Sequence, residues 1–129
     1  MKTYPRQFSR WAVIPFSYTD LPTGVFVPLV KLPLGSYLVS GTVIKETASN
    51  AGTTDTVSAG TQAAPTGYVN ASDFKTAGRT DFTGLPASKS VIASTIGLTR
   101  TVVGAAATQG AGVLLVQYVC PGVEDEVKA

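Results

Sequence analysis

The chain has 129 residues, of which 44% are hydrophobic and only 14% charged, and its formal net charge is +2. A chain of this length fits one domain and can bury a core without disulfides or metals. It has no histidine and one cysteine, Cys120, which excludes histidine-dependent triads, an internal disulfide and a zinc site built from these residues. The ten basic residues form no dense patch, which argues against nucleic-acid binding.

The low charge content also bears on the surface. A free protein surface usually presents many charges of both signs, so a charge-poor surface suggests burial by neighbours. The N-terminal MKTYPRQFSR lacks the apolar core of a signal peptide, and no segment approaches the roughly 20 apolar residues of a membrane span. We therefore expect synthesis in the cytoplasm and no membrane partner.

The first ten residues read as a basic and aromatic arm. Pro5 makes this segment a poor helix start. One interpretation is a loose terminus, and the other is an arm that reaches a partner, because free termini seldom hold aromatic residues so densely. The residues that support the second interpretation are Lys2, Tyr4, Arg6, Phe8 and Arg10.

Two strands interrupted by proline follow the arm. Residues 9–18 place Trp11 and Val13 on one side of an extended chain, opposite Ala12 and Ile14. Residues 23–32 form the second strand. Each has a proline in its middle, and proline cannot donate to a central ladder, so both are expected at sheet edges or corners.

The middle of the chain holds short strands and one helical candidate. Residues 36–46 are rich in β-branched and aromatic residues, and residues 53–58 indicate a short exposed strand. Asn70 or Ser72 is a suitable helix cap and Gly78 a suitable end, so we expect a helix of one or two turns at Ser72–Ala77.

The last strands carry the strongest apolar signal. Residues 90–95 and 96–103 are two strands or one strand bent at Gly97, and residues 113–119 are apolar on both alternating sides, which predicts a central strand covered on both faces. About eight short strands indicate an all-β sandwich or barrel. The expected core residues are Leu38, Val43, Ile44, Ile92, Leu98, Val113, Leu115 and Tyr118.

Few side chains suit catalysis or ligand binding. The carboxylates available for a glycosidase pair are Asp20, Asp55, Asp73 and Asp81. Three of the four lie in turn, cap or threonine-rich contexts, where aspartate commonly bonds the local backbone. No calcium loop or phosphate loop is present. Aromatic residues near the N-terminus suit either core and interface anchors or a sugar-stacking platform.

The segment from Leu34 to Val119 resembles the head decoration, or capsid cement, proteins of tailed phages. The resemblance is carried by LPLGSYLVSGTVIKETASNAGTTDTVSAG, GYVNASDFKTAGRTDF and SVIASTIGLTRTVVGAAATQGAGVLLVQYV. It implies a β-sandwich or jelly-roll fold, many copies bound to the major capsid protein of a head shell, and self-association as trimers or dimers. It also implies no cofactor and no enzymatic activity. The aromatic and proline-rich first 32 residues and the acidic C-terminus depart from the group.

We therefore expect an all-β, single-domain β-sandwich of jelly-roll type with at most one short helix. Residues 1–10 would be the arm, 11–121 the sandwich and 122–129 an acidic tail. The expected function is a non-enzymatic virion protein on the capsid surface that clips neighbouring subunits together. The alternative is a glycan-binding or host-recognition module of a phage particle. The expected partner interface comprises Lys2, Tyr4, Arg6, Phe8, Arg10, Trp11, Phe26 and Pro28.

Overall fold

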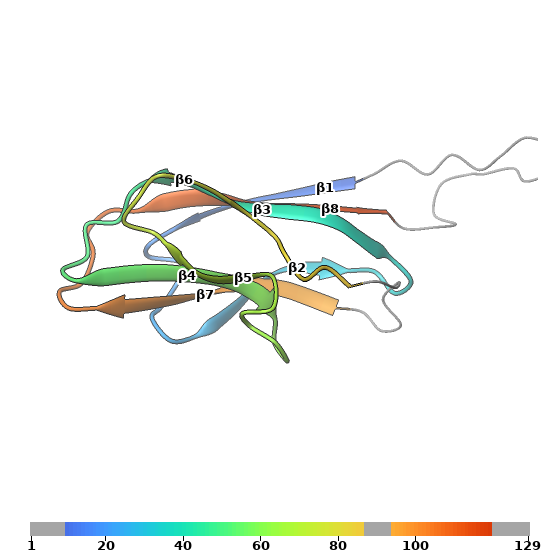
Figure 1. Ribbon diagram of the computed structural model, residues 1–129, viewed down its shortest axis with the longest axis horizontal. Helices are drawn as coiled ribbons and strands as arrows, with labels where there is room; N and C mark the ends of the chain where they lie inside the picture. The colour runs from blue at the N-terminus through green and yellow to red at the C-terminus, as the bar shows by residue number, and fades with distance from the viewer. Residues whose placement is uncertain (1–9, 87–93, 120–129) are drawn as a thin grey trace, which may run out of the picture.

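Two four-stranded antiparallel sheets pack face to face in the computed structural model (Figure 1). The structure describes residues 10–86 and 94–119. Sheet one has the strand order β1-β8-β3-β6 and sheet two the order β2-β7-β4-β5. The strands are β1 (Arg10–Ser17), β2 (Phe26–Leu32), β3 (Tyr37–Thr47), β4 (Thr54–Thr61), β5 (Val69–Asp73), β6 (Gly78–Asp81), β7 (Ser94–Val103) and β8 (Ala111–Val119).

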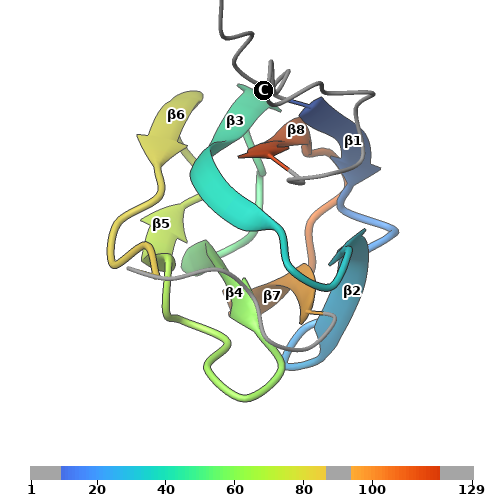
Figure 2. The same cartoon turned by 90° about the vertical axis from the view of Figure 1, so that its right-hand side faces the viewer.

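The strand pairings are nested. β1 pairs with β8, β2 with β7, β3 with β6 and β4 with β5, all antiparallel. This is the pattern of a long hairpin folded over into two layers, which is the eight-stranded jelly roll. Figure 2 shows the two layers from the end of the strands. The predicted all-β sandwich of jelly-roll type is confirmed, whereas the expected arm and acidic tail lie almost wholly outside the described residues and stay predictions.

The predicted helix at Ser72–Ala77 is wrong, and no described residue is helical. These residues end β5 and form the turn into β6. The Asp73 carboxylate accepts hydrogen bonds from the Lys75 backbone N–H at 2.9 Å and from the Thr76 hydroxyl at 3.0 Å. A side chain that bonds the backbone two residues later makes an Asx turn, and helix caps and turns favour the same residue type.

The core lies between the sheets and differs in part from the core that the sequence predicts. Val43 and Leu98 are fully buried as predicted, and Leu38 and Tyr118 pack against the buried cluster. Ile92 lies outside the described residues. The prediction is wrong for three residues whose side chains lie on the outer face, namely Ile44, Val113 and Leu115. β8 is central, but its inward side chains are Leu114 and Val116, and the sandwich covers only that face.

A buried ion pair connects β4 and β7 at one end of the sandwich. Nε and Nη2 of Arg100 donate to the two carboxylate oxygens of Asp55 at 2.8 and 2.5 Å, and these side chains are 6% and 0% exposed. Asp55 also accepts a hydrogen bond from Ser49 Oγ, and Arg100 Nη1 donates to the carbonyl oxygen of Tyr18 at 2.9 Å. Asp55 therefore has a distant partner, where its threonine-rich context had suggested a local backbone bond.

Removing one member of this pair should be strongly destabilising. Asp55→Ala leaves the Arg100 guanidinium buried without a countercharge, and we expect a loss of about 3–5 kcal/mol in the free energy of unfolding. The matched control is Asp81→Ala, which removes an exposed ion pair of 3.8 Å with Arg79 and should cost about 0–1 kcal/mol. Urea denaturation measures both, and equal losses would contradict the structural role of the buried pair.

Two adjacent leucines test the inward face of β8. Leu114 is fully buried, so Leu114→Ala should cost about 2–5 kcal/mol. Leu115 is partly exposed on the outer face, so Leu115→Ala should cost clearly less than its neighbour. The same denaturation assay compares them, and the reverse order would overturn the strand's assigned orientation.

The Asx turn gives stability that depends on pH. The Lys75 backbone N–H, followed by the Thr76 hydroxyl, holds the pKa of Asp73 below its usual range. A carboxyl with a lowered pKa in the folded state stabilises above its unfolded pKa of about 3.9, and this contribution is lost as pH falls through the folded value. Asp73→Asn keeps an acceptor oxygen but cannot ionise. The difference in the free energy of unfolding between wild type and this variant, measured by urea denaturation, should become smaller between pH 5 and pH 2. A difference that stays constant over this range would contradict the role of the Asx turn.

Candidate partner interface

The outer face of sheet one is apolar over β1, β8 and the adjoining part of β3. Residues paired directly across neighbouring strands project from the same face, and the register sets Val13 beside Leu115 and Pro15 beside Val113. On the other side of β8, Val113 is paired with Ile44. We call this surface the apolar face, and it consists of Trp11, Val13, Pro15, Ile44, Val113 and Leu115. Trp11 is 54% exposed and Val13 59%.

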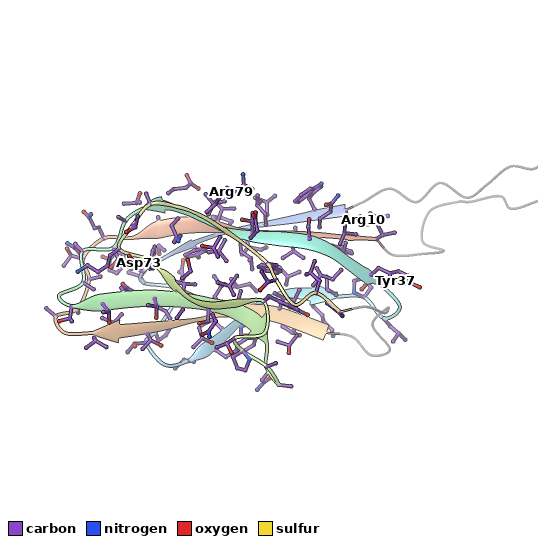
Figure 3. The ribbon with its side chains drawn as sticks, viewed as in Figure 1. Arg10, Tyr37, Asp73 and Arg79 are labelled. Carbon is purple, nitrogen blue, oxygen red and sulfur yellow. The ribbon has the colours of Figure 1, made fainter. Side chains whose placement is uncertain are left out.

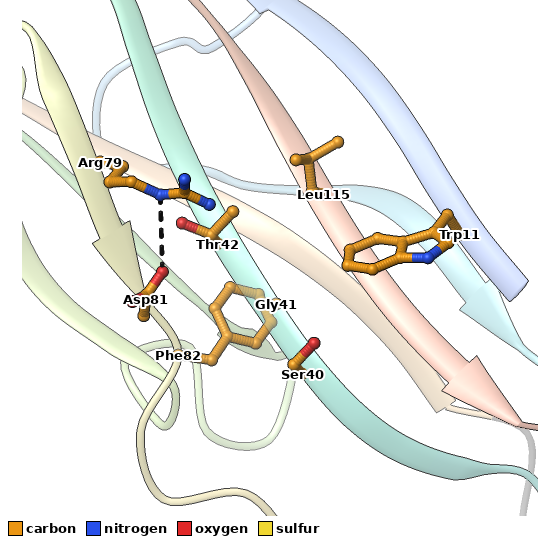
Figure 4. Close-up of a pocket in the computed structure, with 8 residues that line it drawn as sticks. All are labelled: Trp11, Ser40, Gly41, Thr42, Arg79, Asp81, Phe82 and Leu115. Atoms are coloured by element: carbon orange, nitrogen blue, oxygen red, sulfur yellow. Dashed lines mark ion pairs between the residues drawn. The ribbon is translucent and has the colours of Figure 1, made fainter. Parts of the chain in front are cut away.

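A groove of about 320 Å³ opens beside Trp11 (Figure 4). Trp11 forms one rim, Leu115 and Thr42 lie in the middle, and the side chains of β6 form the opposite rim. The Phe82 ring lies beneath β3, where it would come within 2.5 Å of a Cβ atom at Gly41. The complete lining is Trp11, Ser40, Gly41, Thr42, Arg79, Asp81, Phe82 and Leu115.

The far rim of the groove carries one charge of each sign. Arg79 Nε lies 3.8 Å from Asp81 Oδ1, and both side chains are mostly exposed. An exposed pair at this distance is screened by water and contributes little to stability. Both charged groups therefore exchange partners at low cost when another surface approaches.

The outer face of sheet two differs in composition. Gly97, Thr99 and Thr101 on β7 are small or hydroxyl residues, as are their partners on β4, and Val103 at the end of β7 is 51% exposed on the same face. Phe26 is half-buried against Gly97, where a Cβ atom would come within 2.8 Å of the ring. Pro28 is exposed and paired with Gly97. Such a surface offers few large apolar side chains for a partner.

The expected interface residues therefore lie on different faces. Trp11 belongs to the apolar face of sheet one, whereas Phe26 and Pro28 lie on the outer face of sheet two. Arg10 is exposed at the start of β1, beside Tyr118 in the register and at the same end of the sandwich as Tyr37 (Figure 3). The remaining four, Lys2, Tyr4, Arg6 and Phe8, lie outside the described residues.

The aspartates considered for catalysis all have structural partners. Asp20 accepts from the Ser17 backbone N–H at 2.9 Å, Asp55 binds Arg100, Asp73 forms the Asx turn and Asp81 pairs with Arg79. Among the described residues, no group of three histidine, cysteine or acidic side chains is placed to hold a metal ion. That same part of the chain contains no helix long and apolar enough to cross a membrane.

Chains in three solved phage capsid structures have a similar fold. A chain in the capsid asymmetric unit of cyanophage Pam1 superposes with a TM-score of 0.73 at 18% identity, covering 89% of this chain and 86% of that one. A chain of the acid-stable capsid of Helicobacter pylori bacteriophage KHP30 superposes with a TM-score of 0.64 at 22% identity, covering 100% of both chains. A chain of the Ralstonia phage GP4 capsid superposes with a TM-score of 0.62 at 16% identity, covering 91% of this chain and 86% of that one.

At these identities the likeness establishes a shared fold. No protein-family model matches the sequence, and neither does any curated protein.

Proposed function

We propose that this chain is a non-enzymatic structural component of a phage virion that binds the surface of the assembled capsid as a decoration or cement protein. The observation that carries the proposal is the likeness of the whole jelly roll to chains in three phage capsid structures, over at least 86% of each chain compared. The scarcity of catalytic side chains agrees with this role.

The physical mechanism is mass action on the lattice. A protein that binds the assembled shell, and not its free subunits, stabilises the shell by the free energy of binding. Many identical sites add their contributions, so a modest affinity at each site is sufficient. In this proposal the arm of residues 1–10 contacts the major capsid protein, with Tyr4 and Phe8 as apolar anchors.

A glycan-binding or host-recognition module is the second candidate, and one observation favours it. The exposed Trp11 ring stands across a groove from Arg79 and Asp81. An aromatic face suits the apolar face of a pyranose, and neighbouring charged side chains suit its hydroxyl groups. A recognition module at a tail tip is needed in few copies, which separates it from a decoration protein.

Copy number in purified particles distinguishes the two candidates. Quantitative mass spectrometry of virions, normalised to the major capsid protein, should find one copy per shell subunit or per small group of subunits. A handful of copies per particle would favour the recognition module instead. Absence from the particle would contradict both.

Deleting residues 1–8 tests the arm. The described strands begin at Arg10, so the deletion should leave thermal unfolding unchanged. Affinity for empty shells should fall about tenfold or more, equivalent to ~1.4 kcal/mol. The double variant Lys2→Ala, Arg6→Ala measures the electrostatic part of the lost affinity. Electrostatic attraction weakens with added salt, so a salt series separates it from apolar contact. Unchanged affinity after the deletion would place the shell contact elsewhere, on the loops around residues 60–67 or 104–112.

A further inference from the structure

We propose that the apolar face is covered by a second copy of this chain, so that copies associate through sheet one. This concerns contact between copies, which is separate from attachment to a shell, and it holds or fails independently of the proposed function.

The two outer faces of the sandwich differ in composition. Sheet one exposes more than half of Trp11 and of Val13, flanked by Leu115 and Val113 from the neighbouring strand. On the central strands of sheet two the outward residues are threonine, serine and glycine, with Gly60 and Gly97 buried, and Val103 at the end of β7 is the large apolar side chain among them, 51% exposed. Monomeric proteins seldom keep a contiguous apolar patch of more than a few hundred Å² in water. The apolar face therefore has the composition of an interface core.

The area of the face is compatible with an interface between copies. The three strands that carry the apolar face, β1, β8 and β3, are spaced about 4.8 Å apart, and with about 3.3 Å per residue along a nine-residue strand they give a face of roughly 14 by 30 Å, a projected area of roughly 420 Å². A stable interface of standard size needs about 800 Å² from each partner. One copy of this face thus supplies about half of the area that a stable association requires.

The face is also complementary to a copy of itself. Sheets pack on sheets about 10 Å apart with interdigitating side chains, as the two sheets do within this sandwich. The apolar face carries a protruding ring, Trp11, and a groove of about 320 Å³ beside it. Its rim carries Arg79 and Asp81, one charge of each sign. Opposite charges can pair between two copies, whereas a partner of uniform charge would be repelled by one of them.

Two exposed valines on opposite faces provide a matched experiment. Val13 on β1 is 59% exposed and Val103 on β7 is 51% exposed. The molar mass of the full-length protein is measured by light scattering over a concentration series. Wild type should exceed the 13.3 kDa of one chain. Val13→Asp should raise the dissociation constant about a hundredfold or more, whereas Val103→Asp should leave it unchanged.

A charge exchange gives a second measurement. Arg79→Asp places two acids at the rim of each copy and should weaken association, and adding Asp81→Arg to the same chain should restore it. Both positions are exposed, so neither change should alter the fold. Thermal unfolding of every variant checks this.

Several results would overturn the proposal. One is a wild-type protein that keeps the molar mass of one chain at a concentration of about 1 mM. Another is a Val13→Asp variant whose molar mass equals that of the associated wild type. Equal dissociation of the Val13 and Val103 variants would show that the effect is not specific to the apolar face. If Val13→Asp abolishes shell binding without changing the mass of the free protein, the face belongs to the shell contact. None of these results depends on copy number in the virion.

Discussion

The guanidinium of Arg100 joins parts of the chain that no local pattern brings together. It binds Asp55 on the neighbouring strand β4 and donates to the carbonyl oxygens of Tyr18 and Leu21 in the connection from β1 to β2. That connection crosses from sheet one to sheet two. A buried ion pair often adds little net stability compared with apolar residues of the same size. An arrangement of the strands that buries only one member of the pair, however, leaves an unpaired buried charge. The pair therefore selects this arrangement of strands over alternatives that would separate its members.

Polar contacts also join the loops at the ends of the sandwich, including the end that holds the ion pair. At the end that holds the ion pair, hydrogen bonds join the loops. Asn50 Oδ1 accepts a hydrogen bond from the Thr108 backbone N–H at 2.7 Å, and the Gly52 backbone N–H donates to the Ala105 carbonyl oxygen at 2.8 Å. At the other end β1 begins and β8 ends, with Tyr37 beside Val119 in the register. The loop before Tyr37 is hydrogen-bonded as well, since the Ser36 backbone N–H donates to the Pro33 carbonyl oxygen at 3.2 Å. Loops at both ends therefore satisfy backbone groups within the chain.

The strands and the fold class are predictable from the sequence because alternation, proline and glycine are local signals. The orientation of β8 is not, since Val113 and Leu115 are as apolar as Leu114 and Val116. Only the register with β3 and β1 decides which set faces inward. The turn at Asp73 has the sequence of a helix start, because in both structures the side chain accepts a hydrogen bond from the nearby backbone. The groove beside Trp11 needs residues from four strands of one sheet, so no single segment contains its signal.

The edges of the sheets favour association through a face. β1 and β2 are edge strands, and each contains a proline, Pro15 and Pro28. Proline removes one backbone donor and interrupts continuous pairing with an added strand, which is how natural sheets limit contact between their edges. The opposite edge of sheet one, β6, is only four residues long. With both edges of that sheet poorly suited to extension, its outer face is the larger surface left for a partner, and the exposed side chains of Trp11 and Val13 lie there.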